Sequence, residues 1–228
     1  MTGQDPRVTQ KNTFLAGDLR QYVDSMARSP HPYLATIRAD AETHKWSFML
    51  TTKDQAAFLY SAAKMVRAAK ILEIGTYFGH SSLALAAALE QGGHLYTIEH
   101  NPKFARAASA HFLAAGVADD ITVITAEAPL VINQILREHS PGSFDLIFID
   151  ADKKNFKLYW EAALTLTRKS GVIIFDNMLA RGEILNTDDN APSHIAAVRA
   201  FNQSVLADQR AFTSIATIGD GMLLAIKL

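Results

Sequence analysis

The chain has 228 residues, which suits one large domain or two small ones. Hydrophobic residues make up 49% of it, enough for a substantial core, and this excludes an intrinsically disordered chain. The formal net charge of −1 gives no electrostatic support for binding nucleic acid. Because the chain has no cysteine, disulfides, thiolate metal sites and cysteine nucleophiles are also excluded.

The sequence predicts neither a secretory nor a membrane segment. The polar N-terminus, Met1-Thr-Gly-Gln-Asp-Pro-Arg7, lacks a basic stretch followed by an apolar core, so we do not expect a signal peptide. The apolar stretch at residues 83–89 is far too short to span a bilayer. Together with the absence of cysteine, these features predict a soluble, cytoplasmic protein.

Short apolar segments alternate with helix-like segments from about residue 70 onward. The predicted strands are residues 70–74, 94–99, 121–125, 144–150 and 172–175. Between them we expect a helix over residues 81–90, a helix that Pro102 opens and Gly116 closes, and a helix ending near residue 136. This alternation is typical of a parallel sheet with helices on both faces.

Two more apolar segments, residues 212–218 and 222–227, lie near the C-terminus. Only Gly219-Asp-Gly221 separates them, which is too short a link for a crossover helix. They are therefore predicted to pair as an antiparallel hairpin. Ordinary dinucleotide-binding sheets lack such a hairpin.

The first 50 residues do not follow the alternation. Residues 15–26 are predicted to form an amphipathic helix, and two prolines should make residues 29–33 irregular. We expect a single domain over residues 1–228. In it, residues 1–50 would form a helical cap over the ligand crevice or at a subunit contact, and residues 51–228 would form the core.

Carboxylates follow two of the apolar strands at the point where each strand ends. These are Asp150-Ala-Asp-Lys153 and Asp176-Asn177. If the two strands are neighbours, Asp150 and Asp176 start from backbones about 4.8 Å apart. Two carboxylates that close repel each other unless a cation or a shared proton lies between them. With the amide oxygen of Asn177, they form a set of hard oxygens that suits magnesium better than zinc.

A glycine-containing turn, Glu73-Ile-Gly75-Thr-Tyr-Phe-Gly79-His-Ser81, follows the first strand and opens a helix. Its glycine spacing differs from the G-x-G-x-x-G of nicotinamide sites. Glu73 would lie unfavourably beside a pyrophosphate, whereas a cationic amino-acid cofactor would tolerate it. Glu99, at the end of the second strand, is placed to accept hydrogen bonds from ribose hydroxyls. Taken alone, the turn is equally compatible with a generic strand–turn–helix corner.

Together these motifs resemble the class I S-adenosylmethionine-dependent methyltransferases. The combination of Asp150-Ala-Asp-Lys153 with Asp176-Asn177 resembles the cation-dependent O-methyltransferases. That family includes plant caffeoyl-coenzyme A enzymes, animal catechol enzymes and small bacterial members, the kind this chain is similar to from about Met49 to its C-terminus. The resemblance implies an α/β fold with a Rossmann-like, seven-stranded methyltransferase sheet. This sheet would be mostly parallel with a C-terminal antiparallel hairpin and helices on both faces, and residues 51–228 would be its cofactor-binding catalytic core.

The family's roles, carried over by position, imply a site for S-adenosylmethionine and a divalent cation. The cation would be Mg²⁺ in preference to Mn²⁺ or Ca²⁺, and its ligands would be Asp150, Asp176 and Asn177. Lys153 would be the general base, with Asp150 as its catalytic neighbour. The residues implied to hold the cofactor are Thr51, Glu73, Gly75, Ser81, Glu99, Ala128 and Asp152.

Each of these residues also has a simpler interpretation. An Asp at the end of a strand is most often a turn residue or a helix cap, which applies to Asp150, Asp152 and Asp176. Lys153 and Lys154 would then be a solvated pair. Only the joint pattern favours the catalytic interpretation.

One segment departs from the plant enzymes, which carry a Trp and an Asn that touch the substrate after the Asp-Asn pair. Here the segment is Met178-Leu-Ala-Arg-Gly182. Ala180 would open the pocket and Arg181 adds a charge. A coenzyme A ester is therefore in doubt as the substrate, and Arg181 suits an acidic acceptor.

These observations predict an enzyme that transfers a methyl group from S-adenosylmethionine to a hydroxyl of a catechol-like aromatic molecule in a metal-dependent reaction. Two alternatives remain: a methyltransferase for a non-catechol acceptor such as an amine, and a non-catalytic cofactor-binding dimer module. The family resemblance also implies a homodimer. Neither nucleic acid nor a membrane is an expected partner.

Overall fold

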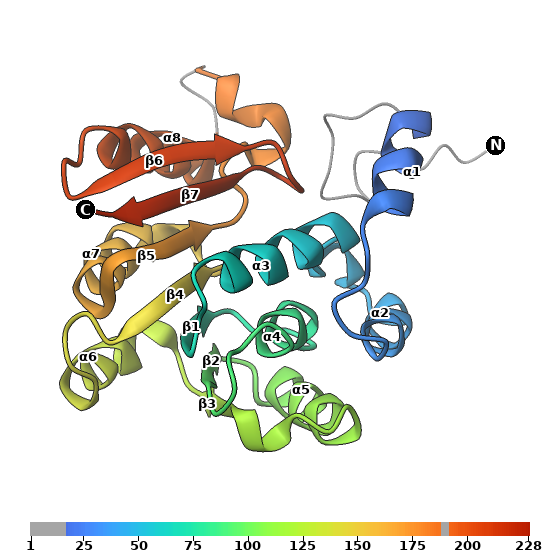
Figure 1. Ribbon diagram of the computed structural model, residues 1–228. Coiled ribbons are helices and arrows are strands. Elements are labelled where there is room, and N and C mark those ends of the chain that lie inside the picture. Colours follow the sequence, from blue (N-terminus) through green and yellow to red (C-terminus); the bar gives the residue numbers. More distant parts are fainter. Residues whose placement is uncertain (1–16, 188–191) are drawn as a thin grey trace.

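The computed structural model describes residues 17–187 and 192–228, which build an α/β structure around a central sheet (Figure 1). In this part of the chain, seven strands form one sheet in the order β3-β2-β1-β4-β5-β7-β6. The strands are β1 (Lys70–Ile74), β2 (His94–Glu99), β3 (Ile121–Thr125), β4 (Phe144–Ile149), β5 (Thr167–Phe175), β6 (Ala211–Ala216) and β7 (Met222–Lys227). β1 to β5 pair in parallel, and β7 is antiparallel to both β5 and β6. The predicted sheet and its C-terminal hairpin are confirmed.

Helices cover both faces of the sheet (Figure 1). The α-helices are α1 (Gly17–Met26), α2 (Leu34–Glu42), α3 (Lys53–Met65), α4 (His80–Ala86), α5 (Pro102–Ala114), α6 (Ala128–Glu138), α7 (Phe156–Leu166) and α8 (Ser193–Leu206). Short 3-10 helices are η2 (Ser47–Met49), η3 (Ala118–Asp120), η4 (Lys153–Asn155) and η5 (Ala180–Leu185). None of the described helices is long and apolar enough to cross a membrane.

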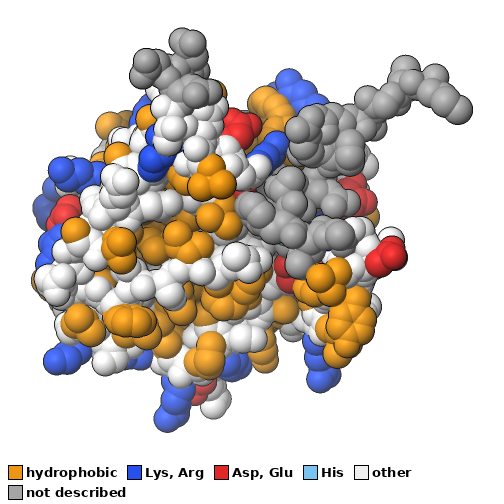
Figure 2. All heavy atoms as spheres, turned by 90° about the horizontal axis from the view of Figure 1, so that it is seen from above, with side chains coloured by type: hydrophobic (Ala, Val, Ile, Leu, Met, Phe, Trp, Pro, Cys, Tyr) orange, Lys and Arg blue, Asp and Glu red, His pale blue; other side chains and the backbone are white. Residues whose placement is uncertain are grey.

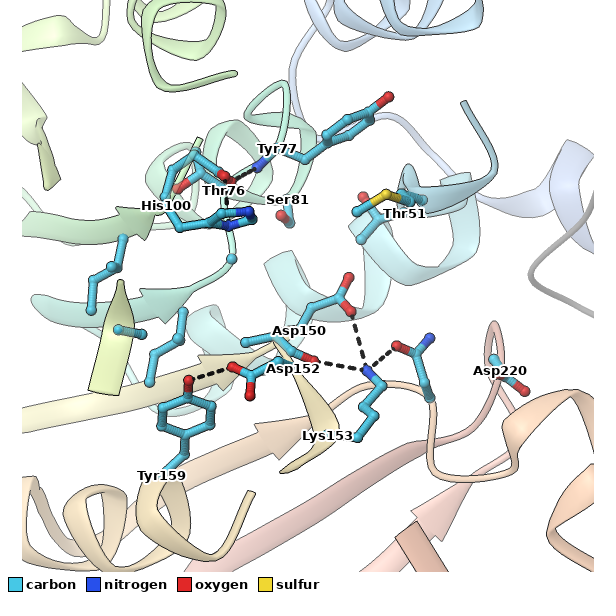
Figure 3. Close-up of a pocket in the computed structure, with 18 of the residues that line it drawn as sticks. Thr51, Thr76, Tyr77, Ser81, His100, Asp150, Asp152, Lys153, Tyr159 and Asp220 are labelled. Carbon is cyan, nitrogen blue, oxygen red and sulfur yellow. Dashed lines mark hydrogen bonds and ion pairs between the residues drawn. The ribbon is translucent and has the colours of Figure 1, made fainter. Parts of the chain in front are cut away.

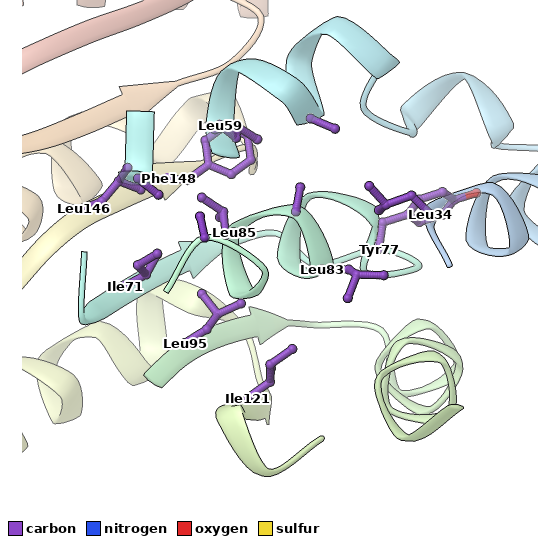
Figure 4. Packing of buried hydrophobic residues seen from close by; sticks show 14 of the residues in the cluster. Leu34, Leu59, Ile71, Tyr77, Leu83, Leu85, Leu95, Ile121, Leu146 and Phe148 are labelled. Carbon is purple, nitrogen blue, oxygen red and sulfur yellow. The ribbon is translucent and has the colours of Figure 1, made fainter. Parts of the chain in front are cut away.

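The core is divided by the sheet into two apolar clusters. Successive strand residues point to opposite faces, so Ile71 packs with α2 to α5, whereas Leu72 packs with α6 to α8. Figure 4 shows the first cluster, in which Leu59 of α3 and Phe148 of β4 lie close together. Because both faces are covered, β4 is an almost continuous apolar run rather than an alternating one.

The strand order places a crevice at the centre of the sheet. From β1 the chain proceeds outward to β2 and β3, and it then returns to the other side of β1 to form β4 and β5. The carboxyl ends of β1 and β4 therefore flank a topological switch point, where ligands bind in sheets of this kind.

The start of α3 is fixed by a capping box. The Thr52 hydroxyl accepts a hydrogen bond from the backbone N–H of Gln55 at 3.4 Å, and Gln55 Oε1 accepts one from the backbone N–H of Thr52 at 2.9 Å. This box sets where the helix begins, and it leaves Thr51 immediately outside the helix, facing the crevice.

Element boundaries differ most from the prediction at α4 and β5. α4 ends at Ala86 rather than near residue 90, because the backbone N–H of Glu90 binds the carbonyl of Ala68 at 2.9 Å and draws the chain back toward β1. β5 begins at Thr167 rather than at residue 172, and it carries a register irregularity against β4.

The N-terminal segment agrees with its predicted local structure where the structure describes it. α1 lies within the predicted helix at residues 15–26, of which residues 15 and 16 fall outside the described residues. Residues 29–33 contain no helix or strand. The division of the chain into a cap and a core remains a prediction.

We predict that Leu59→Ala lowers the free energy of unfolding by about 3 kcal/mol, because Leu59 is a fully buried residue of α3 and the loss of its side chain leaves a cavity. Met65→Ala in the same helix is the control, since Met65 is exposed and the change should cost less than about 0.5 kcal/mol. Urea unfolding measures both values. Equal losses in the two variants would contradict the placement of α3.

Candidate active site

A pocket of about 660 Å³ opens at the carboxyl ends of β1, β2 and β4 (Figure 3). This volume lies within the usual range for ligand sites, about 300–1,000 Å³. The predicted site residues that line it are Thr51, Gly75, Ser81, Glu99, Ala128, Asp150, Asp152, Lys153 and Asn177. Two further predicted residues, Glu73 and Asp176, are fully buried and do not line it.

Gly75 lets β1 and β4 approach each other at the floor of the pocket. Its φ is +100°, and a Cβ at this position would lie 2.2 Å from the backbone oxygen of Asp150. The Asp150 backbone N–H in turn donates to the carbonyl of Ile74 at 2.9 Å. A residue with a side chain would therefore displace the strand end that carries Asp150.

Glu99 ends β2 as a buried carboxylate held by backbone N–H groups. Its Oε2 accepts from Tyr77 N, and its Oε1 accepts from Asn101 N, each at 2.8 Å. His100 Nδ1 lies 3.2 Å from the same Oε1 (Figure 3). Each carboxylate oxygen can accept two hydrogen bonds, so this fixed group can also receive hydroxyl donors from a ligand.

Glu73 lies beneath the pocket. It accepts hydrogen bonds from Thr97 Oγ1, at 2.6 Å, and from Ser82 Oγ. Burial raises the pKa of Glu73 to about 7, and hydrogen bonds from Ser81, Ser82 and Thr97 offset part of that shift. Because Ser81 lines the pocket, Glu73 can act on a ligand through Ser81, and its direct contact with a cofactor remains a prediction.

Lys153, at the start of η4, is the point where the acidic motifs meet (Figure 3). Its Nζ donates to Asn177 Oδ1 at 2.5 Å and to the backbone oxygen of Ala151 at 3.1 Å, and it lies 3.9 Å from Asp150 Oδ1. Oxygens of residues that follow β4 and β5 thus converge on one cationic nitrogen.

Asp176 leaves the sheet beside Asp150, and one of its carboxylate oxygens is held by a distant residue. Its backbone N–H donates to the carbonyl of Ile149 at 2.9 Å, as expected for neighbouring strands. Its Oδ1 accepts from Gln55 Nε2 at 2.9 Å and from the backbone N–H of Asn177 at 2.7 Å. Asn177 has a φ of +66°, which turns the chain so that these neighbouring side chains diverge.

The chemistry of these groups fits a divalent cation in part. Among the described residues, no cluster of three or more His, Cys, Asp or Glu side chains is placed to hold a metal. The predicted ligand set contains two Asp side chains and one Asn. Oxygens of Asp150 and Asn177 already face the positive charge of the Lys153 ammonium, much as they would face a metal ion. Oδ1 of the third predicted ligand, Asp176, accepts a hydrogen bond from Gln55 Nε2.

Asp152 lines the pocket together with Tyr159. Its Oδ1 accepts from the hydroxyl of Tyr159, and its Oδ2 from Asn155 Nδ2, each at 2.6 Å. Burial, together with Asp152, raises the pKa of Tyr159, so its hydroxyl stays a donor. Asp152 was also a candidate helix cap. It accepts a hydrogen bond from the side chain of Asn155, but it makes no capping hydrogen bond to the backbone of η4.

Other residues at the pocket were not identified as site residues from the sequence. The buried ring of His80 shares a hydrogen bond with Thr51 Oγ1, with Nδ1 at 2.8 Å, and Arg38 donates to the Thr51 carbonyl at 2.8 Å. Asp220, in the β6–β7 link, is buried at the pocket wall and accepts from the backbone N–H of Arg181 at 2.6 Å. The glycines on either side of Asp220 predicted only a turn, although an Asp between two glycines is a sequence pattern that could have identified it.

Comparison with known proteins agrees with this geometry. The O-methyltransferase family model matches residues 24–228. The chain belongs to the O-methyltransferase family. This confirms the predicted family and the predicted class of enzyme, a S-adenosylmethionine-dependent O-methyltransferase.

Several relatives resemble this O-methyltransferase over most of its length. Caffeoyl-CoA O-methyltransferase of Populus kitakamiensis is 33% identical over 220 residues, 92% of this chain and 93% of that protein. Catechol O-methyltransferase domain-containing protein 1 of Mus musculus is 31% identical over 210 residues, covering 92% and 80%. The crystal structure of an O-methyltransferase from Bacillus cereus in complex with SAH superimposes with a TM-score of 0.78 at 31% identity, covering 92% of this chain and 97% of that one.

We predict that the stability of the cofactor-free protein in EDTA falls between about pH 5 and pH 8 because of Glu73. Its pKa is raised from 4.5 to about 7, so the folded state favours the protonated form. That contribution is complete below the unfolded pKa and is lost as the pH rises to the folded pKa. Glu73→Gln should remove this loss, which amounts to about 3 kcal/mol at most.

Urea unfolding of both proteins across this pH range measures the difference. Glu90→Gln is the matched control, since Glu90 is partly exposed at the surface. Parallel pH profiles for wild type and Glu73→Gln would show that Glu73 does not titrate as a buried acid.

Proposed function

We propose that this enzyme transfers the methyl group of S-adenosylmethionine to a hydroxyl of a catechol-like small aromatic molecule, using a divalent cation bound by Asp150, Asp176 and Asn177. One observation carries the proposal: oxygens of Asp150 and Asn177 converge with the amine of Lys153 on one side of a pocket suited to the cofactor. Hard oxygen ligands beside a positioned amine suit the activation of a phenolic hydroxyl.

The cofactor would extend across the pocket between two groups of residues. Glu99 would accept hydrogen bonds from the ribose hydroxyls, since its carboxylate is already fixed by backbone N–H groups. Thr51, Gly75 and Ser81 would surround the methionine part. Ala128 and Asp152, together with Tyr159, would enclose the adenine. The complex of the Bacillus cereus relative with SAH supports this use of the pocket.

Methyl transfer from a sulfonium is an in-line displacement by the acceptor oxygen. A neutral phenol has a pKa near 10 and is a weak nucleophile at neutral pH. The cation, when bound, would favour the phenolate and orient two vicinal oxygens.

Lys153 would supply the base for this reaction. Its Nζ lies 3.9 Å from Asp150 Oδ1, so a hydroxyl bound beside that carboxylate is within reach of the amine. In its neutral form the amine would accept the hydroxyl proton, while the carbonyl of Ala151, which accepts from the same amine, holds its position. Much of the rate enhancement would come from this positioning.

We predict that EDTA reduces methyl transfer to catechol acceptors at least about 100-fold and that Mg²⁺ restores it. Asp150→Ala should abolish the metal-dependent activity. Lys153→Gln should lower kcat by about 10²–10⁴-fold, because a positioned base is lost, with little change in cofactor binding. Turnover of caffeic acid and of 3,4-dihydroxybenzyl alcohol, with calorimetric titration of SAH, measures these effects.

Lys154→Gln is the matched control, because Lys154 adjoins Lys153 but is exposed and takes no part in the convergent contacts. Activity indifferent to EDTA would refute the metal assignment. Tight cofactor binding without turnover of any catechol would refute the proposed acceptor and favour a non-catechol one.

We also propose that the enzyme is a homodimer. Hydrophobic side chains gather on the face seen in Figure 2, the side on which β6 forms the edge of the sheet in Figure 1. β6 exposes Phe212 and Ile215, and β7 exposes Ile226. An exposed apolar edge strand is a site where a second chain can pack.

We predict that light scattering gives twice the chain mass of 24.9 kDa and that Phe212→Asp yields a monomer. Leu113→Asp, at an exposed leucine of α5, is the control and should leave the dimer intact. A monomeric wild-type protein would contradict this proposal.

A further inference from the structure

Arg181 lies on an unusual backbone turn at the wall of the pocket. Ala180, Arg181 and Gly182 have successive φ values of +46°, +55° and +86° within η5. Residues with a Cβ adopt this left-handed conformation at a cost of about 1–2 kcal/mol each. Such conformations persist where the surroundings hold them, and they cluster at ligand sites.

The β6–β7 link holds this turn in place. Asp220 Oδ1 accepts from the backbone N–H of Arg181 at 2.6 Å, and the Asp220 carbonyl accepts from Leu179 N at 3.0 Å. Gly221 packs so tightly against Leu179 that a Cβ at the glycine would lie 2.4 Å from the Leu179 side chain. The base of the Arg181 side chain is therefore fixed by a buried carboxylate and by close packing.

The far end of Arg181 lies over an aromatic ring. Its guanidinium carbon is 5.6 Å from the ring centroid of Phe48, and both residues line the pocket that Lys153 and Asn177 also line. Within residues 17–187 and 192–228, no carboxylate forms an ion pair with this guanidinium. A guanidinium placed over a ring keeps the N–H groups at its edge available for a planar anion.

On the basis of the proposed function, we propose that Arg181 is the residue that selects aromatic acceptors carrying a carboxylate. The guanidinium would pair with that carboxylate through parallel N–H···O hydrogen bonds, while Phe48 supports the guanidinium from beneath. The catechol end of the same molecule would then lie toward Asp150 and Lys153. Asp220 is a positioning residue, since it holds the turn that carries Arg181. The pocket also contains Glu183 and Lys154, so the test must separate Arg181 from the general charge of the wall.

The test compares 3,4-dihydroxycinnamic acid with its methyl ester, in which an added methyl group removes the charge of the carboxylate; the Arg181→Gln variant separates the effect of that charge from the effect of the added methyl group. Both kcat/KM with S-adenosylmethionine and Mg²⁺, and calorimetric affinity for the protein loaded with SAH and Mg²⁺, are measured. In the wild type we expect the acid to be preferred over the ester by about tenfold or more. Arg181→Gln should bring this ratio close to one, mainly through KM, Arg181→Lys should retain part of it, and Lys154→Gln should retain all of it.

A wild-type ratio near one, a ratio that persists in Arg181→Gln, or an equal loss in Lys154→Gln would overturn the inference. Equal methylation of acid and ester would leave the proposed function intact while the inference fails. Conversely, if neither compound is methylated but the acid binds in preference to the ester and Arg181→Gln removes that preference, the inference stands and the proposed reaction fails.

Discussion

The register between β4 and β5 determines where the polar chemistry of this enzyme is assembled. Because the backbone N–H of Asp176 binds the carbonyl of Ile149, the two acidic motifs leave the sheet side by side. From there Asn177 turns into the pocket, where its amide oxygen meets the amine of Lys153. A shift of one residue in this pairing would turn the side chains to the opposite face and separate these groups.

The second constraint is the close approach of β1 to β4 at Gly75. This contact places the pocket wall that carries Glu99 and Ser81 against the wall that carries Asp150 and Asp152. The first wall suits a ribose and an amino acid, and the second combines acidic side chains with Lys153. A cofactor and an acceptor held between them would meet at the centre of the crevice, which is the arrangement that methyl transfer requires.

The sequence predicts features that depend on local order along the chain. Strand ends, the hairpin around Asp220 and the meeting of Asp150 with Asn177 follow from apolar runs that stop at polar residues. Side-chain directions that depend on distant segments could not be predicted. Asp176 points to Gln55, which is remote in sequence, and the short α4 results from the tie between Glu90 and Ala68. The support of Thr51 by His80 likewise needs two segments brought together by folding.

The proposed cation site is tested most directly by the crystal structure of the protein with Mn²⁺ and SAH, using the anomalous scattering of manganese. The account predicts one strong peak within about 2.3 Å of oxygens of Asp150 and Asn177. It also predicts that Lys153 Nζ no longer binds Asn177 Oδ1 and that a carboxylate oxygen of Asp176 lies within ligand distance of the ion. A peak elsewhere, or no peak with the contact between Lys153 and Asn177 unchanged, would contradict it.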